Sequence, residues 1–309
     1  MEIQENIYWG WMAASALISF GLWSAAELKK EAKRLPLTAW GLALGTAGAL
    51  LGAKAAYYLC QLGFMIARGW ADSLFRLNPE QMSFFGGAAG LCFGVSLAAR
   101  ICGRRPMEVL NGFAPFGLLF GAFARFGEYF LGMLGIGPYI YLRELCFFPL
   151  ARGFSYGPDY TEWYLAVFVL EGVTLLAVAA LSRWKLKDHR FLRSVFWLCL
   201  PQILLENLRM GSFMWFFCIR VEQLACMTAM FVILIIYGVR TEGSFFRRFR
   251  PAGISLLCAG LFIVCEFAME GKIGFLQFLT QEACYGLMAL GLAVLGVTEV
   301  RAWKRAARK

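Results

Sequence analysis

Two arginine–glutamate pairs lie inside stretches of the sequence that are otherwise apolar. Arg125 and Glu128 are three residues apart in one stretch, and Glu206 and Arg209 repeat that spacing at the end of another. Residues three apart share one face of a helix. An arginine donates two parallel hydrogen bonds to a phosphate, so the two pairs together predict a polar cavity for a phospholipid headgroup. Two ion pairs that only neutralise their own charges have the same spacing, and this alternative stays open.

Lys54, Glu171 and Glu266 also lie within apolar stretches. A charge at the centre of a bilayer costs about 2.5–3.5 kcal/mol on insertion scales, and intramembrane charges therefore usually mark a functional site. Each of these residues is a candidate for a polar site in the membrane.

The segments that carry these charges are apolar enough to cross a membrane. Hydrophobic residues make up 60% of the 309 residues, and the mean hydropathy is +0.62, whereas soluble domains contain about 45–50% apolar residues. Apolar stretches of about 18 residues are typical of transmembrane helices. We expect an all-α integral membrane protein with about nine transmembrane helices, near residues 8–26, 38–62, 84–101, 113–132, 162–182, 192–208, 218–238, 252–269 and 275–299.

The basic residues are unevenly divided between the two sides of this arrangement. Roughly 21 of the 30 lysines and arginines fall in one set of alternate segments, and about 7 fall in the other set. Cytoplasmic segments are enriched in Lys and Arg, which predicts the N-terminus outside and the C-terminus inside. The net charge of +10 is then explained by the membrane topology and by attraction of basic segments to lipid headgroups. No nucleic-acid partner is expected.

The longest outer segment, residues 133–161, is rich in Gly and Pro and is predicted to form a small extracytoplasmic cap between the fourth and fifth helices. Residues 1–7, which precede the first expected helix, carry two acidic residues and no basic one. We therefore expect this helix to be retained rather than removed as a signal peptide.

Small and sulfur-containing residues are interpreted as packing residues. Glycines recur at three- or four-residue spacing in the second segment (41, 45, 48, 52) and the third (86, 90, 94), which favours close helix packing in a membrane. The ten cysteines lie mostly in apolar segments and form no CxxC pattern, so they are expected to be small buried residues. With a single histidine in the chain, no metal site is expected.

A resemblance to the prolipoprotein diacylglyceryl transferases is carried by residues 82–132, MSFFGGAAGLCFGVSLAARICGRRPMEVLNGFAPFGLLFGAFARFGEYFLG. That family typically reads MSFHGG, a helix ending in basic residues, an apolar segment with proline, and GRxGNFxNGE. Four other fragments follow the family's order: IYWGWM (7–12) resembles WYGLM, LLGAKAAYYL (50–59) resembles GARLGYVL, LPQILLENLR (200–209) resembles FRFxxExxR, and VEQLACM (221–227) resembles GQxLSxPM.

The likeness divides the chain into two parts. It implies a transferase-like transmembrane core over residues 1–240, while residues 250–309 add two helices and a basic tail outside the family pattern. It also implies an enzyme of the bacterial cytoplasmic (inner) membrane that moves diacylglyceryl from phosphatidylglycerol to the cysteine of a lipobox-containing precursor. Glycerol phosphate leaves, and no cofactor is used.

The resemblance also assigns site residues. Arg125 matches the arginine of GRxGN and Glu128 stands at its asparagine, and these two are the expected catalytic residues. The phospholipid-binding positions that it implies are Lys54, Gly86, Gly87, Glu206, Arg209 and Gln223.

Four further positions depart from the family pattern. Trp9 replaces a tyrosine, Phe85 replaces the histidine of MSFHGG, Gln202 replaces an arginine, and Met133 replaces a glutamate. The loss of an imidazole at position 85 leaves Glu128 as the candidate base. Three hypotheses follow: a diacylglyceryl transferase with altered chemistry, a non-catalytic lipid- or lipopeptide-binding paralogue, and a transporter or scaffold.

Overall fold

The computed structural model describes residues 2–68, 77–158, 160–186, 188–210, 214–216, 219–271, 274 and 278–307, and it is mostly helical. Within these ranges, seven helices are long and apolar enough to cross a membrane: Leu35–Gly63, Phe84–Ile101, Pro106–Phe130, Val167–Trp184, Val221–Arg240, Phe245–Met269 and Gln281–Ala306. The expected helical, multi-pass membrane character is therefore present in the structure.

Contacts divide the chain into two compact units. Unit 1 contains Met1–Ser194 and Leu208–Met214, and unit 2 contains Val195–Asn207 and Trp215–Lys309. The division falls within helix α6, Arg190–Leu208. The boundary expected from the resemblance lies between residues 240 and 250, whereas the contacts group the whole segment from Trp215 onwards as one unit.

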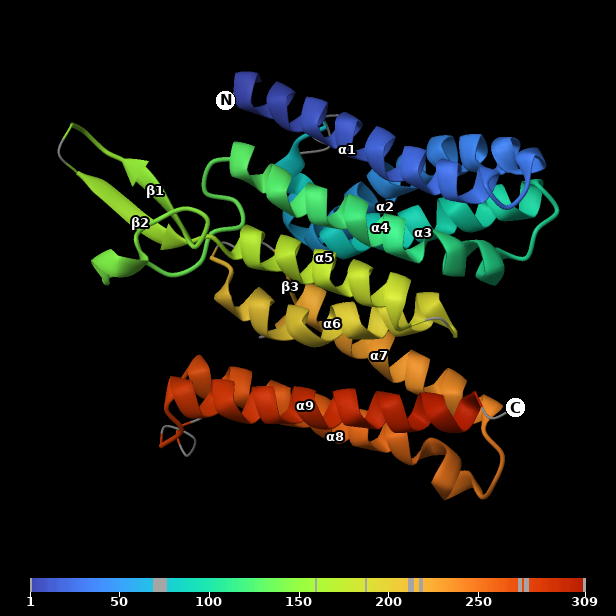
Figure 1. Cartoon of the computed structure of the whole chain (residues 1–309). Helices are drawn as coiled ribbons and strands as arrows, with labels where there is room; N and C mark the ends of the chain where they lie inside the picture. Colours follow the sequence, from blue (N-terminus) through green and yellow to red (C-terminus); the bar gives the residue numbers. More distant parts are fainter. Residues whose placement is uncertain are drawn as a thin grey trace. The chain divides into compact units, whose positions relative to one another are not determined.

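Unit 1 is a bundle of helices with a β-hairpin at one end (Figure 1). Its long helices, besides the start of α6, are α1 (Glu2–Leu28), α2 (Leu35–Arg68), α3 (Phe84–Ile101), α4 (Pro106–Gly127) and α5 (Val167–Trp184). The most extensive helix contacts are those of α2 with α3 and of α4 with α5.

Glycines allow α2 and α3 to approach at backbone distance. A Cβ at Gly90 would overlap the carbonyl oxygen of Gly48, and a Cβ at Gly86 would lie 2.6 Å from the carbonyl oxygen of Gly52. A Cβ at Gly87 would make only ordinary contacts, at 3.4 Å from the Ala49 oxygen. The spacing of small residues predicted this packing, and it accounts for Gly86 without a ligand.

We expect Gly90→Ala to destabilise the protein by about 1–3 kcal/mol, because the new methyl group would force the two backbones apart. Gly87→Ala is the matched control on the same helix and should be close to neutral. Thermal unfolding of the purified protein in detergent measures the difference. Equal melting temperatures for the two variants would contradict the close packing.

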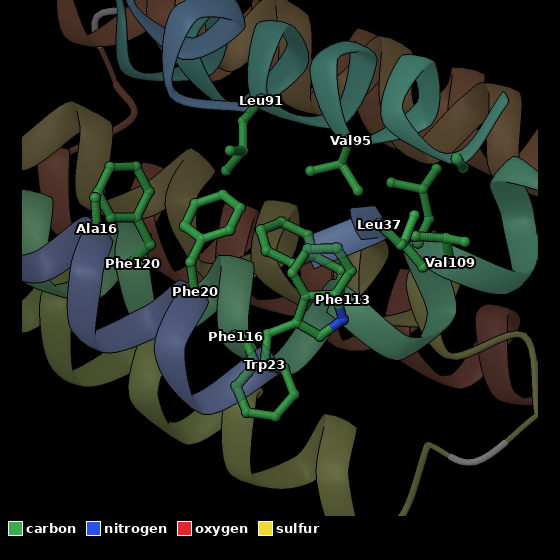
Figure 2. Packing of buried hydrophobic residues seen from close by; sticks show 12 residues of the cluster. Ala16, Phe20, Trp23, Leu37, Leu91, Val95, Val109, Phe113, Phe116 and Phe120 are labelled. Carbon is green, nitrogen blue, oxygen red and sulfur yellow. The ribbon is translucent and has the colours of Figure 1, made fainter. Parts of the chain in front are cut away.

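An aromatic cluster forms the core between α1 and α4 in unit 1. The Phe113 ring centroid lies 5.1 Å from that of Phe20 and 5.0 Å from that of Trp23. Leu91 and Val95 of α3 complete the same buried cluster (Figure 2). This core fixes α4, the helix that carries Arg125 at its end.

The segment between α4 and α5 contains a β-hairpin that the sequence pattern did not predict. Strands β1 (Ala151–Ser155) and β2 (Thr161–Leu165) pair antiparallel, with Gly153 opposite Trp163. Residue 159, inside the predicted cap, lies outside the described residues. The Tyr164 hydroxyl donates to Glu162 at 2.6 Å, and this hydrogen bond, with a smaller effect of burial, raises the pKa of Tyr164 to about 12.

Unit 2 consists of α6 from Val195 to Asn207 and three longer helices. These are α7 (Val221–Arg240), α8 (Phe245–Met269) and α9 (Gln281–Ala306). Two short strands, β3 (Trp215–Phe216) and β4 (Ile219–Arg220), pair just before α7. Helices α8 and α9 pack along each other, and both contact α7 (Figure 1).

Candidate functional site

Four charged side chains of unit 1 form one buried cluster. Arg125 Nη1 lies 2.6 Å from Glu128 Oε1, and Arg209 Nη2 lies 3.0 Å from Glu128 Oε2. Glu171 Oε2 lies 3.2 Å from Arg125 Nε and 2.5 Å from Arg209 Nη1. All four side chains are at least nine-tenths buried. Each carboxylate therefore contacts both arginines, and the cluster carries no net charge. We call it the charge cluster.

Local structure places two members of the charge cluster side by side. Arg125 lies in the last turn of α4, and Glu128 begins the 3-10 turn Glu128–Phe130 that follows. Their three-residue spacing brings the side chains together, as the sequence predicted. Gly135 then leaves room for the carboxylate, since it has a positive φ of 74° and a Cβ there would overlap Glu128 Oε2.

Long-range packing brings the other two members. Helix α5 packs on α4 and carries Glu171, which is fully buried. Gly172 makes this approach possible, because a Cβ there would overlap the Phe126 ring. The backbone N–H of Met210 donates to the Ile136 carbonyl at 2.8 Å, which holds the chain after α6 and with it Arg209.

Phe84 covers one side of Arg125. The guanidinium carbon lies 4.0 Å from the Phe84 ring centroid, a cation–π distance. Phe85 is next along the chain, and its ring packs edge-on against that of Phe84 at 5.5 Å. Position 85, where the family pattern has histidine, is therefore one residue from the side chain that contacts Arg125.

The arrangement of the charge cluster determines how it can bind an anion. Two arginines that face the same two carboxylates are spaced to hold an anion with several oxygens. Phosphate oxygens are such acceptors, but a phosphate binds here only if it displaces a carboxylate. Proton uptake by a displaced carboxylate would then balance the charge.

Unit 2 contains a second buried polar cluster. The Gln223 side-chain amide donates to Glu266 Oε1 at 2.9 Å and to the Ile203 carbonyl at 3.1 Å, and it also contacts Asn207. Glu206, in the same unit, pairs with Arg220, whose Nη1 lies 3.7 Å from Glu206 Oε1. The predicted residues Glu206 and Gln223 thus belong to unit 2.

The remaining predicted binding positions lie in unit 1, on α2 and α3. Lys54 is buried, with its Nζ 3.5 Å from Gln81 Oε1 and 5.2 Å from the Tyr58 ring centroid. Gly86 and Gly87 lie in the first turn of α3.

The substituted positions differ in burial. Gln202 is buried within unit 2, whereas Trp9 on α1 and Phe85 on α3 are half-buried. Met133 is exposed at the start of the segment that leads to the hairpin.

Two residues recognised as intramembrane charges were not assigned to a site by the sequence pattern. Glu171 completes the charge cluster, and Glu266 accepts from Gln223. Their signal was a carboxylate inside an apolar helix, and the resemblance contained no motif for either one. Within the described residues, no group of three or more His, Cys, Asp and Glu side chains is arranged to hold a metal ion.

Comparisons with models of protein families and with curated proteins found no match for this chain.

Proposed function

We propose that this protein transfers the diacylglyceryl group of phosphatidylglycerol to the cysteine thiol of a lipobox-containing precursor, in a bacterial cytoplasmic membrane. The observation that carries the proposal is the position of Glu128, which contacts both Arg125 and Arg209. A phosphate that binds both arginines displaces the Glu128 carboxylate from them. The displaced carboxylate can then act as a base.

The reaction would proceed by exchange of partners in the charge cluster. The phosphate of the lipid takes the place of Glu128 at Arg125 and Arg209. A carboxylate that has lost its arginines accepts a proton more readily, and Glu128 takes it from the thiol. The thiolate then attacks the carbon of the diacylglyceryl group that carries the phosphate, an S–C bond forms, and the bond from that carbon to the phosphate oxygen breaks. Glycerol phosphate leaves with the electron pair, stabilised by the two arginines, and Glu128 returns its proton to water or product.

The topology that this reaction needs is the one expected from the charge asymmetry. Nine crossings with the N-terminus outside place the end of α4, and so Arg125, in the outer half of the membrane. The hairpin segment between α4 and α5 then forms the extracytoplasmic cap. A precursor cysteine that emerges on the outer side would reach the charge cluster from there.

A second candidate function is non-catalytic binding of a lipid or lipopeptide. The balanced pairing of two arginines with two carboxylates favours it, as does the phenyl ring of Phe85 in place of an imidazole. Such a protein would retain phosphatidylglycerol without releasing glycerol phosphate.

The two functions are separated by incubating purified protein with phosphatidylglycerol and a lipobox peptide. Under the proposed transferase function, glycerol phosphate is released, and Arg125→Ala lowers the rate by about 10²-fold or more because the leaving phosphate loses a donor. Arg143→Ala, at an exposed position before the hairpin, is the control and should keep the wild-type rate.

The outcome decides between the candidates. Bound lipid without glycerol phosphate would support the second function and exclude the first. Absence of both release and retained lipid would overturn both. Folding of each variant is followed by size-exclusion chromatography, so that a loss of rate is not confused with a loss of structure.

A further inference from the structure

A groove on unit 2 is lined by residues that belong to neither buried polar cluster. It has a volume of about 430 Å³, within the roughly 300–1,000 Å³ typical of ligand sites. Its lining comes from the middle of α6 and one face of α9, and includes Trp197, Leu200, Leu292, Gly296, Arg301 and Lys304. The groove surface is almost wholly apolar, and Arg301 and Lys304 line its end near the C-terminus with the aliphatic parts of their side chains.

The groove matches one leaflet of a bilayer in length. Leu292 and Lys304 are twelve residues apart on α9, which corresponds to about 18 Å of helix. Half of the hydrocarbon core of a membrane is about 15 Å thick. An acyl chain that lies along α9 from Leu292 would therefore place its headgroup near Lys304.

Gly296 opens the middle of the groove. A Cβ at this position would lie 3.5 Å from the Trp197 ring and 3.6 Å from Leu200 Cδ1. These are ordinary contact distances, so the floor tolerates a methyl group. A larger side chain at position 296 would occupy the space above Trp197 and Leu200.

The basic end of the groove has the charge that a phosphate requires. Arg301 and Lys304 are both exposed, and within the described part of the chain neither one has a carboxylate within ion-pair distance. Exposed cations at the edge of an apolar groove attract anionic lipids from the adjoining leaflet.

We propose that this groove binds one anionic phospholipid from the leaflet on the basic side, with an acyl chain along α9 and the phosphate at Arg301 and Lys304. The site lies within unit 2 and does not depend on the proposed transferase function. It gives α9, outside the family pattern, a role in holding lipid.

Photo-crosslinking in vesicles tests the proposal at the level of peptides. The full-length protein is reconstituted, without an acceptor peptide, with phosphatidylglycerol or phosphatidylcholine that carries a photoreactive group on an acyl chain. We expect the phosphatidylglycerol probe to label peptides that contain Leu200 or residues 292–300, and unlabelled phosphatidylglycerol to compete better than phosphatidylcholine.

Variants separate a specific site from lipid that merely surrounds the protein. Arg301→Gln combined with Lys304→Gln should reduce this labelling roughly tenfold or more, and Gly296→Leu should reduce it by filling the groove. Arg305→Gln is the matched control, since Arg305 is exposed on the same helix and does not line the groove. Equal labelling by the two lipids, or equal labelling of the double variant and the control, would overturn the proposal.

Discussion

Arg209→Met is expected to lower the free energy of unfolding by about 3–5 kcal/mol, since it leaves two buried carboxylates to share one arginine. In the structure, Arg209 contacts Glu128 at 3.0 Å and Glu171 at 2.5 Å. Adding Glu171→Gln should recover most of this loss, because the remaining pair, Arg125 and Glu128, is balanced and 2.6 Å apart. Unfolding in mixed detergent micelles, followed by circular dichroism, measures all three proteins.

The recovery of stability on adding Glu171→Gln distinguishes charge balance from a loss of packing. A loss of packing alone would make the double variant at least as unstable as Arg209→Met, whereas charge balance makes it more stable than either single variant. Arg143→Met, at an exposed position, serves as the control and should be nearly neutral. A double variant less stable than Arg209→Met would refute the view that charge balance holds the cluster together.

Phe85→His is expected to increase the rate of glycerol phosphate release by about 10²-fold or more. Glu128 is a weak base because it is paired with two arginines, whereas a positioned general base contributes typically 10²–10⁴-fold. Phe85 stands one residue from the ring that contacts Arg125. The gain should grow as the pH rises through the ordinary imidazole pKa of about 6.5, since only the neutral ring accepts a proton. Release is measured with phosphatidylglycerol and a lipobox peptide across this pH range.

A histidine elsewhere on the same helix provides the control for Phe85→His. Phe93, also on α3, is 70% exposed, and Phe93→His should leave the rate unchanged. If both variants behave like the wild type while the wild type itself turns over, an imidazole at position 85 adds nothing to the base that Glu128 supplies, and Glu128→Gln becomes the decisive variant. If neither the wild type nor Phe85→His releases glycerol phosphate, the lipid-binding function is favoured.

Local patterns in the sequence predicted the apolar helices and two of the four members of the charge cluster, Arg125 and Glu128. Long apolar segments predicted membrane helices because hydrocarbon leaves no alternative for the backbone hydrogen bonds. Glycines at regular spacing predicted close helix packing, and Gly48 and Gly90 show it. The Arg125–Glu128 pair followed from a three-residue spacing, since one turn of helix is enough to bring the two side chains together.

Tertiary structure decided which distant charges join that pair. The sequence predicted Arg209 and Glu206 there, whereas the structure brings Arg209 and Glu171, and Glu206 pairs with Arg220 in unit 2. Glu171 is separated from Glu128 by 43 positions and Arg209 by 81, and the β-hairpin lies between Glu128 and Glu171. Their meeting depends on the packing of α5 against α4 and on the path of the chain after α6, neither of which has a periodic signal in the sequence. The sequence marked Glu171 as a charge in an apolar segment, but only packing could identify its partners, because a buried charge is stabilised by whatever the fold brings within reach.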